Sequence, residues 1–539
     1  MLYVTMQPQP QLNPDQFHEW YNNEHGPTRL RIPSIFTNGL RYRATDGEQP
    51  EYLADYDVTD MALLETETYL CLRANRSPRE AATIGQVKVD RKFFDLVSEH
   101  KSDKFTPIEQ LTDKEAEGLV LISVEVSLQK TEGAYEQAIK WYQEEHIPML
   151  SKVPGWLRSR IFTTPSVIEG GASEVKIVTL HDYAKVNGLG GPEHKASMAT
   201  SWRDEVFSKY IGTKSRRAYE LFYVFGPGPR ELDSLSRLPA SGAFQSPNDN
   251  GKALSSVPGQ NGDAVVTSFI TMADGCEIPY RLEGNTSHHA PTVAFCNSLL
   301  TSLHMWDPLV AILKQKRPDL RILRYDTRGR HSVPKPETPA TLDIVSDDLA
   351  ALLKALRIEK LHTLIGVSMG GATTLKFALK YPNLLEKFIA CDFNVNSSDA
   401  NTQAWKERIA VAEDEASGGI KTLAGQTVSR WFHPHTMTAK TEVASWMTDM
   451  VATNSVQGFR FGCQALWDYD MREEMKGCTV PGLLVVGDGD AGGKLVKAME
   501  GFKGLVGKEG AELKIVPQAG HLPMCESPED FWAAIEAWL

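Results

Sequence analysis

The sequence lacks the patterns that mark secreted, zinc-binding and membrane-spanning proteins. Its seven cysteines are scattered, odd in number and never spaced as C-x-x-C, which argues against a disulfide framework and a zinc site. No uninterrupted apolar run approaches the roughly 20 residues needed to cross a bilayer. The first residues carry neither a charged segment nor a long apolar one, so we expect no signal peptide. We therefore expect a cytoplasmic protein with reduced thiols and no bound metal.

Positive charge is also scarce. The formal net charge is −12, and no local cluster of Lys and Arg compensates for it. Neither a nucleic acid nor a membrane is therefore expected as a partner, which leaves a small-molecule substrate. The 539 residues are too many for one hydrophobic core, so several domains are expected.

The first half of the chain contains an internal repeat. The segment 17–27 returns at 138–148, with Trp, Tyr, Glu, His and Pro each recurring 121 residues later. Each copy opens with a β-like stretch and continues into an amphipathic helix that ends near the proline. We predict two tandem β-α-β-β-α-β units, at residues 1–112 and 113–226.

The signature W-Y-x-x-E-H-x-P, present in both copies, resembles the EthD-like branch of the dimeric α/β-barrel, ferredoxin-like superfamily. In that family two ferredoxin-like units pack sheet to sheet, usually from two chains. Here both units lie on one chain, so either the barrel closes within it or a homodimer forms through it. Relatives use such histidines on small aromatic or polyketide substrates, which makes His25 and His146 candidate acid–base groups. The alternative is a structural role, in which each histidine holds the helix end beside its proline.

The composition changes after Gly226. Residues 227–261 are rich in Ser, Pro, Asn and Gly and read as a flexible linker. From residue 262 to 539, short apolar runs alternate with helical patterns, which is typical of a mostly parallel α/β sheet. The predicted strands lie at 265–272, 279–283, 292–297, 321–326, 362–367, 388–392, 483–487 and 513–517. Between the strands at 388–392 and 483–487, residues 397–476 form aromatic-bearing helical segments that predict a cap over the sheet edge where α/β proteins bind ligands.

A G-x-S-x-G pentapeptide lies at residues 366–370, between an apolar strand and a helix-like run. This context is what a nucleophile elbow requires, with Ser368 exposed at the start of the helix. A serine needs a base and a group that orients the base, and in this fold the chain order is Ser, acid, His. His521, after the last strand, is the predicted base. Asp490 is the predicted acid, and Asp488 and Asp392 are the alternatives.

The reaction also needs donors for the oxyanion. One is predicted to be the backbone N–H of Met369, directly after the nucleophile. The other is expected from the loop after the third strand, at Leu299 or its neighbour Ser298.

Several motifs of this half resemble the 3-oxoadipate enol-lactonase group of α/β-hydrolases. They are Asn297-Ser298-Leu299, Met305-Trp306-Asp307-Pro308, Arg324-Tyr325-Asp326-Thr327-Arg328-Gly329, the elbow, Trp431-Phe432 and Gly520-His521-Leu522-Pro523. The resemblance implies opening of a lactone or ester through an acyl-enzyme, with no metal or organic cofactor. Ser298, Trp306, Trp431 and Trp467 are candidate substrate contacts. Where the family reads N-S-L-G, this chain has Leu300, which, with the aromatic cap, suggests a larger, more apolar acyl group.

The overall prediction combines α+β and α/β classes: tandem ferredoxin-like repeats followed by an α/β-hydrolase domain with a helical cap. A lactone or ester hydrolase is the leading function. C–C bond hydrolysis of a β-diketone-type substrate on the same triad is one alternative, because specificity resides in the cap. Another is a bifunctional enzyme whose N-terminal barrel is a cofactorless cyclase, decarboxylase or oxygenase. In a last alternative the barrel is only a dimerisation or binding module.

Overall fold

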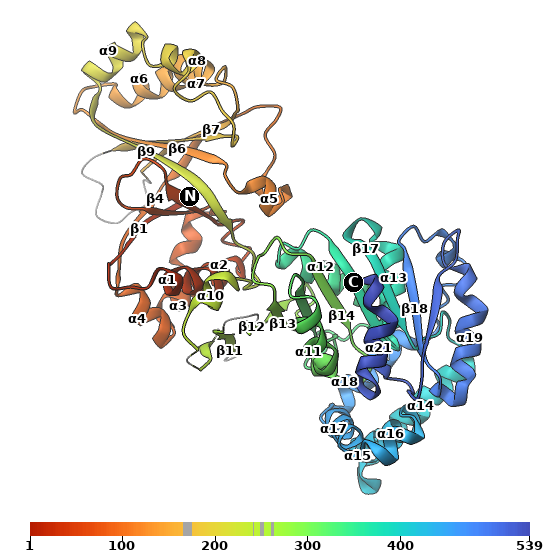
Figure 1. The fold of residues 1–539 in the computed structure, drawn as a ribbon. Helices are drawn as coiled ribbons and strands as arrows, with labels where there is room; N and C mark the ends of the chain where they lie inside the picture. Colours follow the sequence, from red (N-terminus) through yellow and green to blue (C-terminus); the bar gives the residue numbers. More distant parts are fainter. Residues whose placement is uncertain (165–174, 241, 248–252, 260–262) are drawn as a thin grey trace. The chain divides into compact units, whose positions relative to one another are not determined.

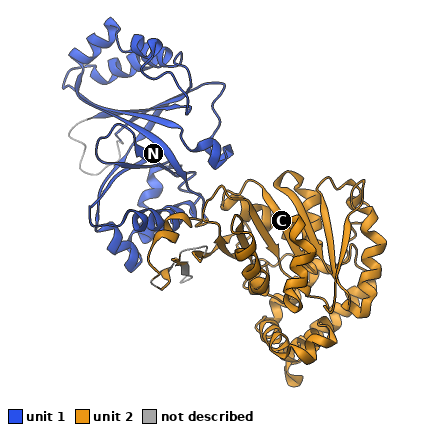
Figure 2. Ribbon diagram, in the orientation of Figure 1, with its two compact units in different colours: residues 1–227 blue, residues 228–539 orange. Residues whose placement is uncertain are grey.

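The computed structural model describes residues 1–164, 175–240, 242–247, 253–259 and 263–539. The chain divides into two compact units, Met1–Pro227 and Gly228–Leu539 (Figure 2). Each unit has its own buried core. Within the described residues, no helix is both long and apolar enough to cross a membrane.

A curled antiparallel sheet of nine strands forms the centre of the first unit (Figure 1). The strand order is β4-β1-β3-β2-β9-β6-β8-β7-β5. The strands are β1 (Leu2–Pro8), β2 (Leu40–Ala44), β3 (Tyr52–Tyr56), β4 (Val87–Phe93), β5 (Asp95–Lys101), β6 (Val120–Leu128), β7 (Trp156–Thr163), β8 (Lys176–Tyr183) and β9 (Ile211–Val224).

The repeated segment forms the same helical structure twice. α1 (Pro14–Trp20) continues through a π-helical turn (Tyr21–His25) into α2 (Gly26–Leu30), and α6 (Ala134–Trp141) continues through Tyr142–His146 into α7 (Ile147–Leu150). Each repeated proline lies in the first turn of the following helix, where a missing N–H is tolerated. The two tryptophans at the ends of α1 and α6 are each 1% exposed and anchor these helices in their cores.

Other helices complete the two layers that cover this sheet (Figure 1). α3 (Glu67–Ala74) and α4 (Pro78–Ile84) belong to the first repeat, and α8 (Pro192–Ser197) and α9 (Ser201–Lys209) to the second. The short helix α5 (Asp113–Ala116) precedes β6 and begins with a capping box between Thr112 and Glu115.

The strands of the two repeats are joined at two places in the sheet. β9 pairs with β6 along its first part and with β2 along its last residues. β4 and β5 are separated by Phe94 alone, and β4 pairs with β1 whereas β5 pairs with β7. The two ends of the strand order are therefore successive parts of one stretch of chain, residues 87–101.

The segment 227–261 differs from the flexible linker that its composition predicts. It contains α10 (Asp233–Arg237) and the strands β10 (Phe244–Pro247) and β11 (Ala253–Val257), and β11 pairs with β12 of the second unit. Leu232, Leu235 and Leu238 are buried in the core of that unit. Three leucines at helical spacing are enough to pack the segment, although small and polar residues surround them. Residues 241, 248–252 and 260–261 of the predicted linker lie outside the described residues.

A ten-stranded sheet, ordered β10-β11-β12-β13-β15-β14-β16-β17-β18-β19, forms the centre of the second unit. The eight strands that the sequence predicts are all present. They are β12 (Val265–Thr271), β13 (Glu277–Gly284), β14 (Thr292–Cys296), β15 (Arg321–Tyr325), β16 (Leu361–Val367), β17 (Leu385–Cys391), β18 (Gly482–Gly487) and β19 (Glu512–Val516). From β15 to β19 neighbouring strands are parallel, whereas β12 and β13 pair antiparallel.

The reversal of strand order at β15-β14-β16 decides where the helices lie. Right-handed crossovers place α11 (Asp307–Lys316), between β14 and β15, and α12 (Leu342–Ala355), between β15 and β16, on opposite faces of the sheet. The observed contacts agree, because α12 packs against α13 (Met369–Lys380) and α11 packs against α21 (Pro528–Ile535). α19 (Lys494–Phe502) follows β18, and α20 (Pro523–Glu526) precedes α21.

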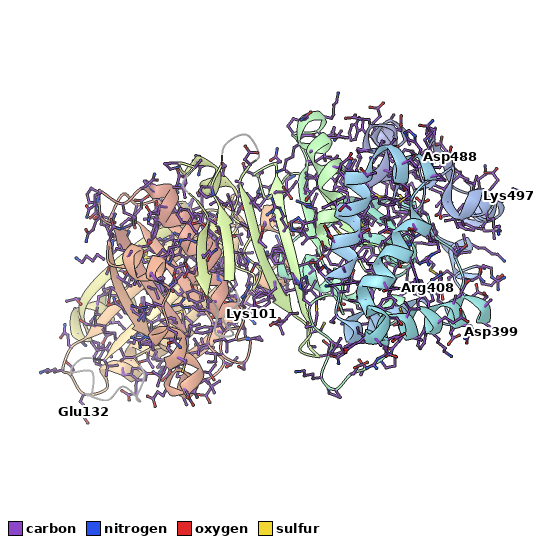
Figure 3. All side chains as sticks on the ribbon, turned by 90° about the horizontal axis from the view of Figure 1, so that it is seen from below. Lys101, Glu132, Asp399, Arg408, Asp488 and Lys497 are labelled. Atoms are coloured by element: carbon purple, nitrogen blue, oxygen red, sulfur yellow. The ribbon has the colours of Figure 1, made fainter. Side chains whose placement is uncertain are left out.

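Helices replace strands between β17 and β18, as the sequence predicts. They are α14 (Asp399–Glu413), α15 (Gly419–Trp431), α16 (Pro434–Ala439), α17 (Thr441–Ala452) and α18 (Val456–Cys463), and we call them the cap. Asp399 begins α14 and Arg408 lies further along the same helix (Figure 3).

Candidate active site

Ser368 alone makes the turn between β16, which ends at Val367, and α13, which begins at Met369. Its φ of 61° and ψ of −119° lie in a region that disfavours residues with a side chain. The turn is held because the Ser368 N–H donates to the carbonyl oxygen of Cys391 on β17 at 2.9 Å. The serine thus stands at the N-terminus of a twelve-residue helix, whose dipole favours negative charge.

Gly370 brings this turn against the end of β14. A Cβ on Gly370 would lie 2.0 Å from the carbonyl oxygen of Cys296 and 2.7 Å from that of Asn297. A Cβ on Gly366 would lie 2.1 Å from the carbonyl oxygen of Gly370. Only residues without side chains permit these approaches. The approach places the backbone after Ser368, with the predicted donor Met369 N–H, beside the loop after β14, from which the second predicted oxyanion donor comes.

His521 and Asp490 meet through a hydrogen bond of 2.7 Å between Nδ1 and Oδ2. His521 follows β19 and Asp490 follows β18, so both lie at the same edge of the sheet as Ser368. The His521 backbone N–H donates to the carbonyl oxygen of Trp431 in the cap at 2.7 Å, which fixes the loop. Ser368 is half-buried, and its hydroxyl makes no hydrogen bond to any residue that the structure describes.

The two alternative acids lie in different surroundings. Asp488 is exposed at the surface (Figure 3), and its Oδ1 accepts from the Ala519 N–H at 3.3 Å. Asp392 is 1% exposed, and its Oδ1 accepts from the Gly487 N–H at 2.9 Å. Of these carboxylates, Asp490 is the one that bonds the imidazole.

Asp392 lies behind Asp490, and the two carboxyl groups titrate differently. Burial, followed by repulsion from Asp490, raises the pKa of Asp392 well above its usual value. Burial also acts to raise the pKa of Asp490, but attraction to His521 and hydrogen bonds from His521 and Asp392 hold that pKa below its usual value. The contact between the two groups therefore separates their pKa values, so that Asp392 holds a proton to a higher pH than Asp490 does.

These three side chains also have the chemistry of metal ligands. One ligand atom each of Asp392, Asp490 and His521 lies within 4.8 Å of the others. The His521 Nδ1 and the Asp490 Oδ2 already bond each other, however, and the Asp392 Oδ1 already accepts from the backbone. A metal ion bound by the three residues would have to displace the bond between His521 and Asp490.

The loop after β14 is fixed by the side chain of Asn297. Its Nδ2 donates to the carbonyl oxygen of Tyr325 at 2.9 Å, and its Oδ1 accepts from Trp306 Nε1 at 2.9 Å. Asp326 accepts from the Leu303 N–H at 2.6 Å and bonds Nε2 of His331 at 2.6 Å. These bonds anchor the two ends of the loop that carries Leu299.

The candidate substrate contacts occupy different positions. Trp306 is fully buried and bonds Asn297, so it supports the loop from beneath. Ser298 is 2% exposed. The ring of Trp431 lies 5.5 Å from that of His521, and Trp467 is half-buried in the loop after α18 with its Nε1 unpaired among the described residues.

Glu526 is a residue of this site that the sequence does not single out. It is fully buried and accepts from four donors: the N–H groups of His433, Gly520 and Leu522 and the hydroxyl of Thr436. Burial raises its pKa, and these hydrogen bonds oppose the shift. It ties the cap to both sides of His521. An acidic residue directly after the apolar run 522–525 is the one signal that marks it.

In the first unit, His25 and His146 are not brought together. His25 bonds Glu80 through Nδ1 at 2.7 Å, and burial lowers its pKa to about 4. His146 stacks on Trp141, with ring centroids 4.5 Å apart, and burial lowers its pKa to about 3. Each imidazole belongs to the core of its own repeat.

Residues 291–528 match the family model described as alpha/beta hydrolase fold. The chain is 28% identical to 3-oxoadipate enol-lactonase 2 of Acinetobacter baylyi over 247 residues, which cover 46% of this chain and 88% of that protein. It is 30% identical to 3-oxoadipate enol-lactonase 1 of the same organism over 224 residues, or 41% and 79% of the two chains. Among solved structures, the enol-lactonase from Burkholderia xenovorans LB400 is 27% identical with a TM-score of 0.44, covering 50% of this chain and 99% of that one. The sequence matches confirm the predicted resemblance of the second half, whereas the EthD-like resemblance of residues 1–226 stays a prediction.

Proposed function

The chain belongs to the α/β-hydrolase fold family and is a hydrolase of the ester or lactone type, and from this premise we propose that Ser368, His521 and Asp490 form its catalytic triad. The observation that carries the proposal is the 2.7 Å bond between His521 and Asp490 at the sheet edge where Ser368 makes its strained turn. A serine hydroxyl is a weak nucleophile at neutral pH and needs such an oriented base.

In the proposed reaction the Ser368 oxygen attacks the carbonyl carbon while Nε2 of His521 takes the hydroxyl proton. Ionised Asp490 stabilises the imidazolium through Nδ1. The backbone N–H groups of Met369 and Leu299 donate to the oxyanion, each contributing about 3 kcal/mol. When the C–O bond to the leaving alcohol breaks, His521 returns the proton to that oxygen. A water that His521 deprotonates then attacks the acyl-enzyme and releases the acid and the serine.

We propose an acyl group larger and more apolar than that of 3-oxoadipate. Leu300 has a φ of 72°, is 4% exposed, and its carbonyl oxygen accepts from Asn454 in the cap loop at 2.7 Å. A bulky residue thus keeps a backbone conformation that glycine adopts more easily. Turnover of small dicarboxylic enol-lactones should be compared with that of bulky aryl esters, and a clear preference for the former would refute this substrate class.

Covalent labelling tests the proposed nucleophile without a known substrate. A fluorophosphonate reagent should modify the full chain once, and mass spectrometry should map the adduct to Ser368. Ser368→Ala should abolish labelling, whereas Ser332→Ala, which removes an ordinary hydroxyl of the same unit, should not. An adduct on another residue, or ester turnover that persists in Ser368→Ala, would contradict the assignment.

For residues 1–226 we propose two ferredoxin-like repeats that close one barrel within a single chain. Two features support this: the orders β4-β1-β3-β2 and β9-β6-β8-β7 are the same within each repeat, and the stretch 87–101 joins the two ends of the strand order. Light scattering of the full chain should then report the mass of one chain. A dimer that dissociates when β4 or β5 is altered would oppose the proposal.

A further inference from the structure

The cap contacts two successive residues of the loop after β14, and the first of them is the predicted oxyanion donor Leu299. The Leu299 side chain lies against α18, where a Cβ on Gly462 would be only 2.7 Å from Leu299 Cδ1. The carbonyl oxygen of Leu300 accepts from Nδ2 of Asn454, in the loop between α17 and α18, at 2.7 Å. The cap therefore supports this part of the loop directly.

Asn454 lies in a segment that is bonded on several sides. Its Nδ2 also donates to the carbonyl oxygen of Val451 at 2.8 Å, so both hydrogens of the amide are used. The preceding residue, Thr453, accepts at Oγ1 from Nη2 of Arg330, in the loop after β15, at 2.6 Å. These bonds fix the place from which Asn454 donates to Leu300.

Leu300 has a backbone conformation that needs such support. Its φ of 72° lies in the left-handed region, which a residue with a Cβ adopts at a cost in energy. An Asn or Asp at this place could stabilise the conformation through its own side chain, but a leucine has no polar group to do so. Such a conformation persists only where neighbouring groups hold it. The bond from Asn454 is made at the carbonyl of the strained residue itself.

A change at Leu300 would reach the oxyanion donor because the two residues are successive. Each residue turns only about φ and ψ, so a Leu300 that left the left-handed region would rotate the peptide group that joins it to Leu299. A donor is effective only at about 2.7–3.1 Å from the oxyanion. A Leu299 N–H that turned away would slow the chemical step more than it would weaken binding before that step.

We propose that Asn454 is a positioning residue of the reaction proposed above. By bonding the Leu300 carbonyl oxygen, it holds the left-handed backbone that orients the Leu299 N–H toward the oxyanion. This inference rests on the proposed catalysis by Ser368. It adds that the cap completes the oxyanion hole through one amide side chain, besides covering the site.

The rate at which a fluorophosphonate modifies Ser368 in the full chain tests the proposal without a known substrate. The phosphonyl oxygen gains negative charge during the attack, so it draws on the same donors as an ester would. We expect Asn454→Ala to lower the limiting rate at saturating reagent by about tenfold or more, with little change in the half-saturating concentration. Asn454→Asp, of equal size but without the donating NH₂, should behave alike. Asn401→Ala, at an exposed position of α14, should alter neither constant.

The same change in a second background separates orientation of the backbone from mere docking of the cap. Glycine keeps a positive φ without support, so in chains that carry Leu300→Gly the further change Asn454→Ala should cost less than about twofold. Equal costs in the two backgrounds, or an unchanged limiting rate in both Asn454 variants, would overturn the proposal while leaving Ser368 as the nucleophile. An adduct that maps to a residue other than Ser368 would overturn the proposed function and this inference together.

Discussion

Asp392 lies directly behind Asp490, so that the carboxylate bonded to His521 is itself close to a second carboxyl group, whose pKa is raised by burial and by repulsion from Asp490. The two come from the ends of neighbouring strands, β17 and β18. Asp392 is fixed from the other side by the Gly487 N–H, at 2.9 Å. At this place Asp392 lowers the pKa of Asp490, while the imidazole bonds Asp490.

The raised pKa of Asp392 predicts a specific pH dependence of stability. The folded chain keeps a proton on Asp392 that the unfolded chain loses above a pH of about 4. The wild-type free energy of unfolding should therefore fall as pH rises above that value, by up to about 1.4 kcal/mol per pH unit from this group. Asp392→Asn keeps an oxygen that can accept from the Gly487 N–H and cannot ionise, so urea denaturation at pH 5 to 8 should show a flatter profile. Equal slopes in the two proteins would show that Asp392 is ionised.

The members of the proposed triad should act as a unit. Ser368→Ala and His521→Ala should each lower kcat by about 10⁴-fold or more, and the double variant should lose little beyond that. Asp490→Asn should be severe but less complete. Asp488→Asn is the matched control, because the same change at an exposed carboxylate two residues away should leave turnover close to wild type. Comparable losses in Asp488→Asn and Asp490→Asn would contradict the acid assignment.

The strand-end positions of the site could be predicted because local patterns constrain them. The pentapeptide around Ser368 needs a strand before it and a helix after it, and His521 follows the last apolar run. The supporting carboxyls could not be predicted in the same way. Asp392 contacts a strand 95 residues later, at Gly487, and Glu526 gathers donors from a cap helix about 90 residues earlier. Such partners depend on the fold as a whole.

The first unit likewise has features that local sequence patterns predict and features that they do not. The recurring Trp-Tyr and Glu-His-x-Pro residues reveal the duplication, because they fall on one helix face in each copy. Alternating polarity shows where strands occur but not which strand pairs with which. Two features arise from packing between distant segments. Residues 87–101 divide at Phe94 between two partner strands, and Leu235 is buried in a segment of linker-like composition.

Glu526 should act through the position of the histidine loop. In the wild type, N–H and hydroxyl donors face the Glu526 carboxylate. Glu526→Gln places an NH₂ group against them, which should lower the free energy of unfolding by about 1–3 kcal/mol. Because the loop carries His521, kcat should fall more than KM rises. Glu529→Gln, at an exposed position three residues later, makes the same chemical change and should alter neither. Kinetics and urea denaturation of both variants check this, and an unchanged kcat in Glu526→Gln would show that the loop is held by other contacts.

A pair of glycine substitutions tests how closely the serine turn approaches β14. Gly370→Ala would place a Cβ 2.0 Å from the Cys296 carbonyl oxygen, which belongs to a buried strand and cannot move aside. We expect a loss of several kcal/mol or failure to fold, in line with overpacking of a rigid site. Gly425→Ala, within α15, meets nothing within 4 Å and should raise stability by about 1 kcal/mol through helix propensity. Thermal denaturation compares the two directly. If Gly370→Ala is as stable as the wild type, the turn is not pressed against the strand, and the Met369 N–H has no fixed position from which to stabilise an oxyanion.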